Sequence, residues 1–278
     1  MEKSLQNRPE AKNSSRRLIV RVDDAGFSWA ANIGCLRACT DGIARSVEVM
    51  MPCAWTAHAA QLFGAHPQID IGIHLTLTSE WDAVKWRPLT QATSLTDAQG
   101  NFLPLLMPRD GDDRPALQRH PWELADIEAE LHAQLVLGKA MFPQATHVSA
   151  HMVRHFADFD TRVGAVVSDL CRRFDLGDDP FAQGIPRFDG YPRQPCDAAF
   201  RTASFVEGLG KLDAATHIFI DHPVVPSPDF AAVGHVGYED VGQDRTSCLQ
   251  VLTDDAVAGA VNTLGIEVIS CAQALANT

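Results

Sequence analysis

The stretch RLIVRVDDAGFS, residues 17–28, begins as an apolar strand and ends in two adjacent carboxylates. Its apolar run from Leu18 to Val22 is typical of a strand buried on both faces, as in a parallel sheet. Two acids at the end of such a strand need a role, because an unpaired buried carboxylate costs free energy. The simplest role is structural, with Asp24 as the N-cap of a helix that begins near Ala30.

Asp23 and Asp24 also admit a functional interpretation. Successive side chains of a strand point to opposite faces. One carboxylate could therefore bind a metal ion, while the other, released by the turn, acts beside it as a base. Gly26 allows the chain to leave the strand sharply and keeps the backbone close to whatever binds there. For an isolated pair of aspartates the capping role is favoured, so a functional role needs support from other motifs in the chain.

Short β-rich runs alternate with helical patterns along the whole chain. The expected strands are 17–22, 46–51, 69–74, 146–150, 216–221 and 265–269, and the expected helices are 30–42, 55–66, 122–141, 160–174 and 254–264. Strands separated by helices indicate parallel βαβ units. Six or seven such units in a chain of 278 residues favour a (β/α) barrel. A doubly wound open sheet stays open as the alternative, because periodicity cannot show closure.

Two stretches, 78–121 and 178–200, lack a regular pattern. The first is rich in Trp, Pro and Asp, and the second contains four prolines. Connections of this length are typically functional, so we expect 78–121 to cover one face of the domain. Residues 1–16 are polar and are expected to form a disordered leader, which leaves 17–278 as a single domain.

The composition restricts the class of protein. A net charge of −12 argues against nucleic acid or an anionic membrane as the main partner, because phosphates require a basic face. The seven cysteines form no CxxC pair, which is typical of a reduced, cytoplasmic protein. No apolar run reaches the length of a membrane span.

Three further predicted strands end in imidazole or carboxylate groups. His74 ends the strand in IDIGIHLTLT, His151 follows the strand in THVSAHMVRH, and Asp221 and His222 end the strand in THIFIDHPVV. The carboxyl ends of parallel strands share one face, where the active sites of barrels lie. One Asp with two neutral His residues is a usual set of catalytic zinc ligands, and it also admits other divalent ions.

These motifs, together with DRTSCLQVLTDDAVAGAVNTLGIEVIS at 244–270, resemble the YdjC-like carbohydrate deacetylase family over residues 17–272. The resemblance implies a deformed, TIM-barrel-like (β/α) barrel in the α/β class, related to the NodB-type deacetylases. It also implies metal-dependent removal of an acetyl group from an N-acetylated sugar or oligosaccharide.

The resemblance carries functional roles onto individual residues of this chain. It implies that Asp24, His74 and His151 are the metal ligands, that Asp23 is the general base and that His222 is the general acid. The ligand set favours Zn²⁺, with Mg²⁺ or another divalent ion as the alternative.

The chain also departs from the family run THIDSHHHVH. Ser149 stands where Asp is usual, and Val153 replaces a second His. The loss at Val153 leaves a non-catalytic sugar-binding relative open. Another metal-dependent barrel enzyme, such as a phosphoesterase or an isomerase, is the second alternative. A two-metal phosphoesterase needs more ligands, and the chain has no HxH pair near its first strand.

Substrate contacts are expected from two places in the chain. Trp81, Trp86 and Arg87 follow His74 and could form an aromatic platform for the CH face of a sugar, although packing of the 78–121 stretch is an equal alternative. Arg245 could contact the substrate or form a surface salt bridge. The expected partner is a small acetylated sugar, and a homodimer stays open.

Overall fold

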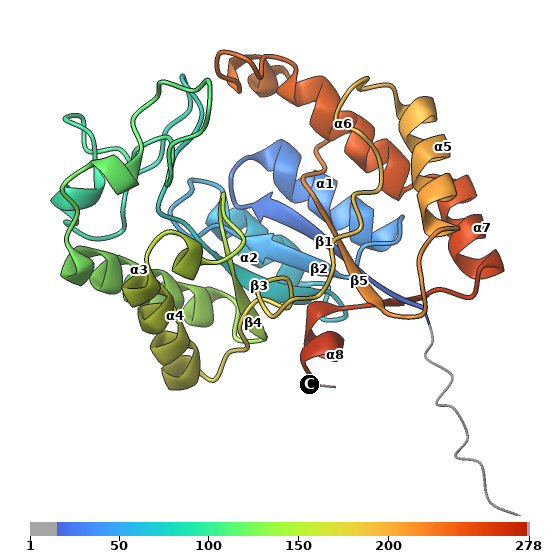
Figure 1. Cartoon of the computed structure of the whole chain (residues 1–278), viewed down its shortest axis with the longest axis horizontal. Helices are drawn as coiled ribbons and strands as arrows, with labels where there is room; N and C mark the ends of the chain where they lie inside the picture. The colour runs from blue at the N-terminus through green and yellow to red at the C-terminus, as the bar shows by residue number, and fades with distance from the viewer. Residues whose placement is uncertain (1–15, 277–278) are drawn as a thin grey trace, which may run out of the picture.

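A parallel sheet lies at the centre of the computed structural model, which describes residues 16–276 (Figure 1). In this part of the chain the sheet has six strands: β1 (Arg17–Ala25), β2 (Ser46–Val49), β3 (Asp70–Leu75), β4 (His147–Ala150), β5 (Thr216–Asp221) and β6 (Glu267–Ile269). Each predicted strand is present, with most of the boundaries moved by a few residues.

The strand order explains why the barrel is deformed. The order is β4-β3-β2-β1-β5. Strand β6 pairs with the first residues of β1, on the same side of β1 where β2 pairs with its later residues. Strands β4 and β5 stand at the two edges. Gly177 bridges to His147 of β4 and Arg187 bridges to Ile218 of β5, so the segment 177–187 spans the gap between the edges. The predicted deformed (β/α) barrel is confirmed as a curled, half-open parallel sheet.

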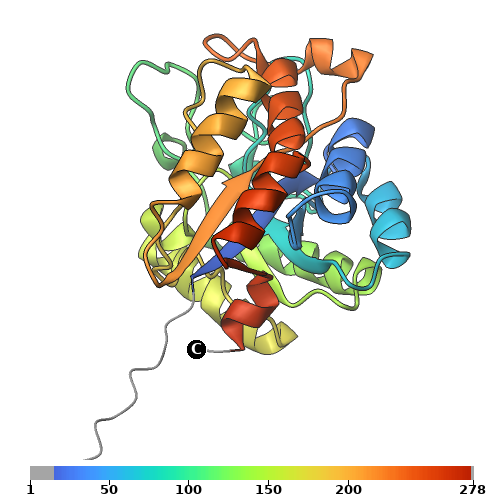
Figure 2. The same ribbon diagram turned by 90° about the vertical axis from the view of Figure 1, so that its right-hand side faces the viewer.

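Helices cover the outer face of this sheet (Figure 1, Figure 2). In the described chain they are α1 (Trp29–Thr40), α2 (Thr56–Gly64), α3 (Leu124–Met141), α4 (Thr161–Phe174), α5 (Ala198–Leu209), α6 (Val241–Leu252), α7 (Asp255–Thr263) and α8 (Cys271–Leu275). The sequence did not predict α5, α6 or α8. The buried faces of α5 and α6 carry Arg201 and Arg245, which interrupt the apolar period, and α8 is too short to show one.

The stretch 78–121 follows β3 and leads to α3. Its regular structure in the described chain is limited to two 3₁₀ turns, Thr93–Leu95 and Leu117–Arg119. It is anchored on α3, where the buried carboxylate of Glu130 accepts hydrogen bonds from the backbone N–H groups of Leu89 and Thr90. Two further 3₁₀ turns, Phe156–Asp158 and Pro228–Ala232, lie in the loops after β4 and β5.

The capping role considered for Asp24 is wrong. The N-cap of α1 is Ser28, whose Oγ accepts a hydrogen bond from the backbone N–H of Ala31 at 3.0 Å. Asp24 instead lies in the strand with a left-handed φ of 69°, at a register shift between Val22 and Ala25. The pair of aspartates is therefore free for another role.

The other expectations concern the termini, the cysteines and membrane spans. The predicted leader, 1–16, lies outside the described residues except for Arg16. All seven cysteines lie within residues 16–276, where they are free thiols that are buried or half-buried, as predicted. Within the same residues no helix combines the length and the apolar character that crossing a membrane requires.

Gly34 allows α1 to pack directly on the segment that follows His222. A β-carbon at Gly34 would lie 2.3 Å from the carbonyl oxygen of Pro223 and 2.5 Å from the Cα of Val224. Overpacking of this kind costs ~1–3 kcal/mol, so we expect Gly34→Ala to lower the free energy of unfolding in urea by about that amount.

The matched control is Gly259→Ala on α7. Among the described residues nothing lies within 4 Å of a β-carbon at Gly259. Because alanine has the higher helix propensity by up to ~1 kcal/mol, this variant should be as stable as the wild type or more stable. A Gly34→Ala protein with wild-type stability would contradict the close packing of α1.

Candidate metal centre and active site

The carboxyl ends of four strands bring the predicted functional residues together. Asp23 and Asp24 lie at the end of β1, His74 is the penultimate residue of β3, and His151 and His222 follow β4 and β5 directly. All five side chains line one cavity of about 400 Å³. The shared face that the sequence predicts is therefore found.

Both carboxylates of the aspartate pair face this cavity. Oδ2 of Asp23 lies 3.8 Å from Nε2 of His74, and Oδ1 of Asp24 lies 3.7 Å from the same nitrogen. A regular strand would send the two side chains to opposite faces, which is what the sequence predicts. The left-handed backbone of Asp24 and the adjacent register shift break that alternation and turn both side chains to one side.

Asp24, His74 and His151 have the arrangement of a metal-binding site. Each offers one ligand atom, and these atoms lie within 4.8 Å of one another. Oδ1 of Asp24 lies 3.7 Å from Nε2 of His74 and 3.4 Å from Nδ1 of His151, and it is buried with no hydrogen-bond partner among the described residues. Ligands at ~2.0–2.1 Å around a tetrahedral ion lie roughly 3.3–3.4 Å apart, so the donor set fits a divalent cation.

In His74 and His151, the ring nitrogen that faces away from Asp24 contacts a neighbouring side chain. Nδ1 of His74 lies 2.7 Å from Oγ of Ser149, and Nε2 of His151 lies 3.0 Å from Oε2 of Glu80. Such partners set the orientation of metal-binding imidazoles. Sequence reasoning missed Glu80, because it lies in the irregular stretch after β3 and carries no pattern of its own.

The charges of the cluster suit a cation. Burial and the neighbouring imidazole of His151 lower the pKa of His74 to about 3, which keeps His74 neutral as a ligand must be. Burial also lowers the pKa of His151, but Glu80 and Asp24 outweigh it and raise the pKa to about 10. The carboxylates of Glu80 and Asp24 thus stabilise a positive charge between them, and a bound metal ion would supply such a charge.

Arg21 forms a bidentate ion pair with the carboxylate of Asp23. Its Nε and Nη2 donate to the two oxygens of Asp23 at 2.9 and 3.0 Å, and its Nη1 donates to Asp179 at 2.9 Å. All three side chains are buried. Burial outweighs the guanidinium and raises the pKa of Asp23 to about 6. Sequence reasoning missed Arg21, although a cation inside an apolar strand was a usable signal.

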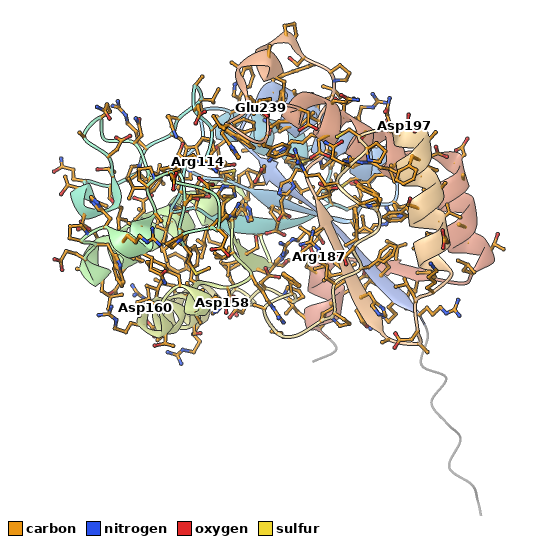
Figure 3. The ribbon with its side chains drawn as sticks, turned by 45° about the horizontal axis from the view of Figure 1, so that its top comes forward. Arg114, Asp158, Asp160, Arg187, Asp197 and Glu239 are labelled. Carbon is orange, nitrogen blue, oxygen red and sulfur yellow. The ribbon has the colours of Figure 1, made fainter. Side chains whose placement is uncertain are left out.

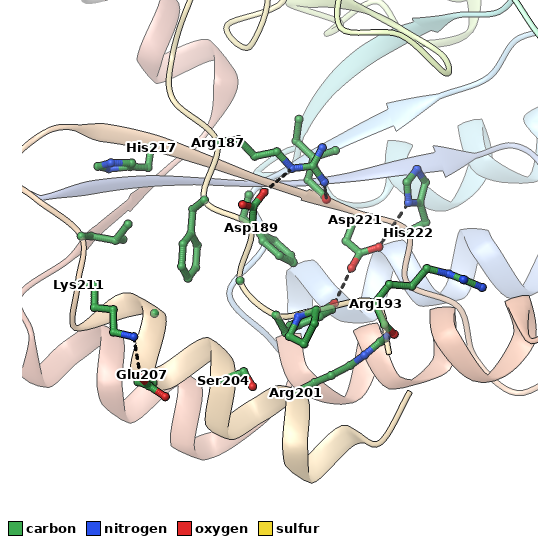
Figure 4. Close-up of a pocket in the computed structure, with 18 of the residues that line it drawn as sticks. Arg187, Asp189, Arg193, Arg201, Ser204, Glu207, Lys211, His217, Asp221 and His222 are labelled. Atoms are coloured by element: carbon green, nitrogen blue, oxygen red, sulfur yellow. Dashed lines mark hydrogen bonds and ion pairs between the residues drawn. The ribbon is translucent and has the colours of Figure 1, made fainter. Parts of the chain in front are cut away.

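His222 closes the opposite side of the cavity. Its ring is half-buried, with Nε2 3.9 Å from Oδ2 of Asp24 and Nδ1 3.4 Å from Oδ1 of Asp221 (Figure 4). Tyr191 donates a hydrogen bond to the other oxygen of Asp221 at 2.5 Å. Burial lowers the pKa of His222, but the carboxylates of Asp24 and Asp221 raise it above its ordinary value.

The cavity around Asp24, His74 and His151 is called the metal-site cavity below. Of the four residues considered for substrate contacts, Trp81 and Arg245 line it. Nη1 of Arg245 forms an ion pair with Oδ2 of Asp24 at 2.9 Å. The Arg245 guanidinium also lies 5.2 Å from the centre of the Trp81 ring. Arg245 is therefore a buried neighbour of the proposed ligands and not a surface residue.

Trp86 and Arg87 do not line this cavity, although the Trp86 ring packs edge-on against the His151 ring, with 6.2 Å between the ring centres. The Trp86 indole is buried, and its N–H donates to the backbone carbonyl of Thr78 at 2.7 Å. Arg87 is exposed and donates to Asn101 at 3.2 Å. Neither residue is among those described around the metal-site cavity.

A larger cavity of about 1210 Å³ opens beside the first (Figure 4). Arg187, Ile220 and His222 line both cavities, so the two adjoin. The larger cavity lies between α5 and the loop that carries Tyr191. Figure 3 shows Arg187 near the middle of this face of the molecule. A ligand at His222 could thus extend away from the proposed metal ligands.

Comparison with known proteins identifies the family. The model of the YdjC-like proteins matches residues 17–263. A carbohydrate deacetylase of Geobacillus stearothermophilus is 29% identical over 263 residues, which are 92% of this chain and 96% of that protein. A chitooligosaccharide deacetylase of Yersinia enterocolitica is 36% identical over 135 residues, which are 48% of each chain.

A crystal structure of a protein from Enterococcus faecalis V583 shares the fold. It superposes with a TM-score of 0.75 at 19% sequence identity, over 94% of this chain and 99% of that one. The family match spans every strand except β6, including the four that carry the clustered carboxylates and imidazoles. This chain therefore belongs to the YdjC-like family.

Proposed function

We propose that this protein is a metal-dependent carbohydrate deacetylase, a hydrolase that removes the acetyl group from an N-acetylated sugar or oligosaccharide. The observation that carries the proposal is the buried Oδ1 of Asp24, which has no hydrogen bond among the described residues and faces one nitrogen each of His74 and His151. The names of the relatives from Geobacillus and Yersinia support the reaction and the substrate class.

Asp24, His74 and His151 would hold the cation, with Zn²⁺ favoured by one carboxylate and two imidazoles and Mg²⁺ as the alternative. A bound divalent cation would lower the pKa of a water molecule and polarise the acetyl carbonyl. The side chains around it then have to take one proton and supply another.

Asp23 is the proposed general base. Its carboxylate lies in the cavity, 3.8 Å from Nε2 of His74, and Arg21 fixes both of its oxygens. It would take the proton of the attacking water as the oxygen bonds to the acetyl carbon. A pKa of about 6 leaves Asp23 mostly ionised at neutral pH, as a base requires.

His222 is the proposed general acid. Its raised pKa favours the protonated ring, and Asp221 and Tyr191 orient it from behind. It would give its proton to the nitrogen as the C–N bond breaks, so that acetate and a free amine leave. Because His222 also borders the larger cavity, sugar units beyond the acetylated one would lie there, toward Tyr191.

Acetate release tests this function directly. Purified protein is incubated with N-acetylglucosamine and its β-1,4-linked dimer and trimer, and acetate is measured by an enzyme-coupled assay. We expect release that disappears after treatment with a chelator and returns with Zn²⁺ or Mg²⁺, because the proposed chemistry depends on the cation.

Two results would overturn the proposal. Hydrolysis of nitrophenyl phosphate without acetate release from any sugar would indicate a phosphoesterase. Binding of the sugars without turnover, in protein shown to contain metal, would indicate a non-catalytic relative.

A further inference from the structure

A buried chain of hydrogen bonds leads from His74 away from the cavity and into the sheet. Nδ1 of His74 lies 2.7 Å from Oγ of Ser149, and Ser149 donates to Oε2 of Glu48. The second oxygen of Glu48, Oε1, lies 2.7 Å from Nε2 of His147. These four side chains are at most 2% exposed, so bulk water does not compete for the contacts.

The direction of each hydrogen bond follows from the chemistry of the groups. Burial raises the pKa of Glu48, but the adjacent His147 outweighs it and lowers the pKa to about 2, so Glu48 is ionised and can only accept. Ser149 has one hydroxyl proton, and Glu48 takes it. The Ser149 oxygen must then accept from Nδ1–H of His74. His74 is left with a lone pair on Nε2, the nitrogen that faces Asp24.

We propose that Ser149 and Glu48 form a relay that fixes His74 in the tautomer that binds the metal. The residues described around the metal-site cavity do not include Ser149 or Glu48, so both are positioning residues that act through His74. The relay rests on the metal centre of the proposed function and is independent of the substrate.

The sheet is built to hold the Glu48 carboxylate in this place. Glu48 of β2 pairs in register with Gly72 of β3, and His74 pairs with Ser149 of β4, so the relay crosses three neighbouring strands (Figure 1). A β-carbon at Gly72 would lie 2.1 Å from Oε2 of Glu48. Glycine therefore leaves the room that the carboxylate occupies. His147 and Ser149, two residues apart, share one face of β4 and each engages one oxygen of Glu48.

His147 supplies the charge that keeps Glu48 ionised. Thr146 donates its hydroxyl proton to Asp70 at 2.7 Å and so accepts from Nδ1 of His147 at 2.8 Å. Because Nε2 also donates to Glu48, His147 is a buried imidazolium. Glu48, His147 and Cys271 lie close enough together to suggest a second metal site. Both nitrogens of His147 are already donors, so an ion pair accounts for this cluster.

The tautomer of His74 is the first test. Full-length protein labelled with ¹⁵N-histidine is studied by NMR without added metal, and the His74 signals are assigned by their loss in His74→Gln. We expect a neutral ring protonated on Nδ1. In Glu48→Gln the new amide faces Ser149, whose hydroxyl then turns to His74, so the proton should move to Nε2. A wild-type His74 that is protonated on Nε2 overturns the relay, whether or not the variant folds.

Metal affinity is the second test, measured by calorimetric titration with Zn²⁺. Loss of an outer partner of a metal-binding residue costs about 10–100-fold in affinity, and we expect this loss in Ser149→Ala and in Glu48→Gln. Ser168→Ala is the matched control, because that hydroxyl bonds to the Gly164 carbonyl of its own helix, and its affinity should not change.

A double variant separates positioning from folding. Ser149→Asp combined with Glu48→Gln puts a carboxylate next to Nδ1 of His74 and should recover Zn²⁺ affinity relative to Glu48→Gln alone. Wild-type affinity in both single variants overturns the relay. Protein that shows the expected tautomer and Zn²⁺ affinities but releases no acetate overturns the proposed reaction and supports the relay.

Discussion

Replacement of Asp24 by alanine is expected to remove the bound divalent metal and acetate release together. Asp24 supplies the anionic ligand of the proposed centre, and its loss leaves the two neutral or protonated imidazoles of His74 and His151. Loss of metal catalysis removes several kcal/mol of transition-state stabilisation, which corresponds to a fall in kcat/KM of about 10³-fold or more. Metal content by plasma mass spectrometry and acetate release measure the two effects. His74→Ala should behave in the same way.

The control for Asp24→Ala is Asp41→Ala. Asp41 is an exposed carboxylate beyond the end of α1 that pairs with Arg37, and its loss should change neither metal content nor activity. Circular dichroism establishes that both variants are folded. A folded Asp24→Ala protein with the wild-type metal content would place the cation elsewhere.

Asp23→Asn should have the second-largest effect, with a different signature. The amide keeps the shape of the side chain but cannot take a proton from water. Loss of a general base costs about 10²–10⁴-fold in rate, so we expect kcat to fall by that factor while metal content stays at the wild-type value. Asp169→Asn, an exposed change on α4, is the control. Full activity in Asp23→Asn would refute the assignment of the base.

The pH dependence of the wild type should carry the same information. Burial raises the pKa of Asp23 to about 6, so this carboxylate becomes protonated as the pH falls through that region. A protonated base cannot accept the water proton. A divalent cation bound beside Asp23 would favour its ionised form, so kcat/KM should decline on the acid side at or below pH 6, and Asp23→Asn should lose that part of the profile.

Much of the site was predictable because it follows from strand direction. Asp24, His74, His151 and His222 each end a run with strand character, and parallel strands place such ends on one face. These four residues and Asp23 do line one cavity. The fold class was predictable for a similar reason, because alternating strands and helices admit few topologies.

The local conformation of the aspartate pair was not predictable. In sequence, Asp24 looks like a helix cap, and in a regular strand it would face away from Asp23. The cap is Ser28, four positions later, and the left-handed turn at Asp24 brings both carboxylates to His74. That conformation depends on how the end of β1 meets its neighbours, and a one-dimensional pattern does not contain this information.

The sequence by itself determined the six strands, five of the eight α-helices of the described chain and the residues at the strand ends, because these depend on short-range periodicity and on chain direction. The tertiary structure alone decided the partners of those residues. Arg21 holds Asp23, Glu80 holds His151, and Glu48 reaches His74 through Ser149. Except for Arg21, these partners come from other strands and loops. Their hydrogen bonds to the buried site residues therefore form only when the sheet has assembled. Asp23 and Asp24 are therefore part of a buried polar network that the sequence alone does not reveal.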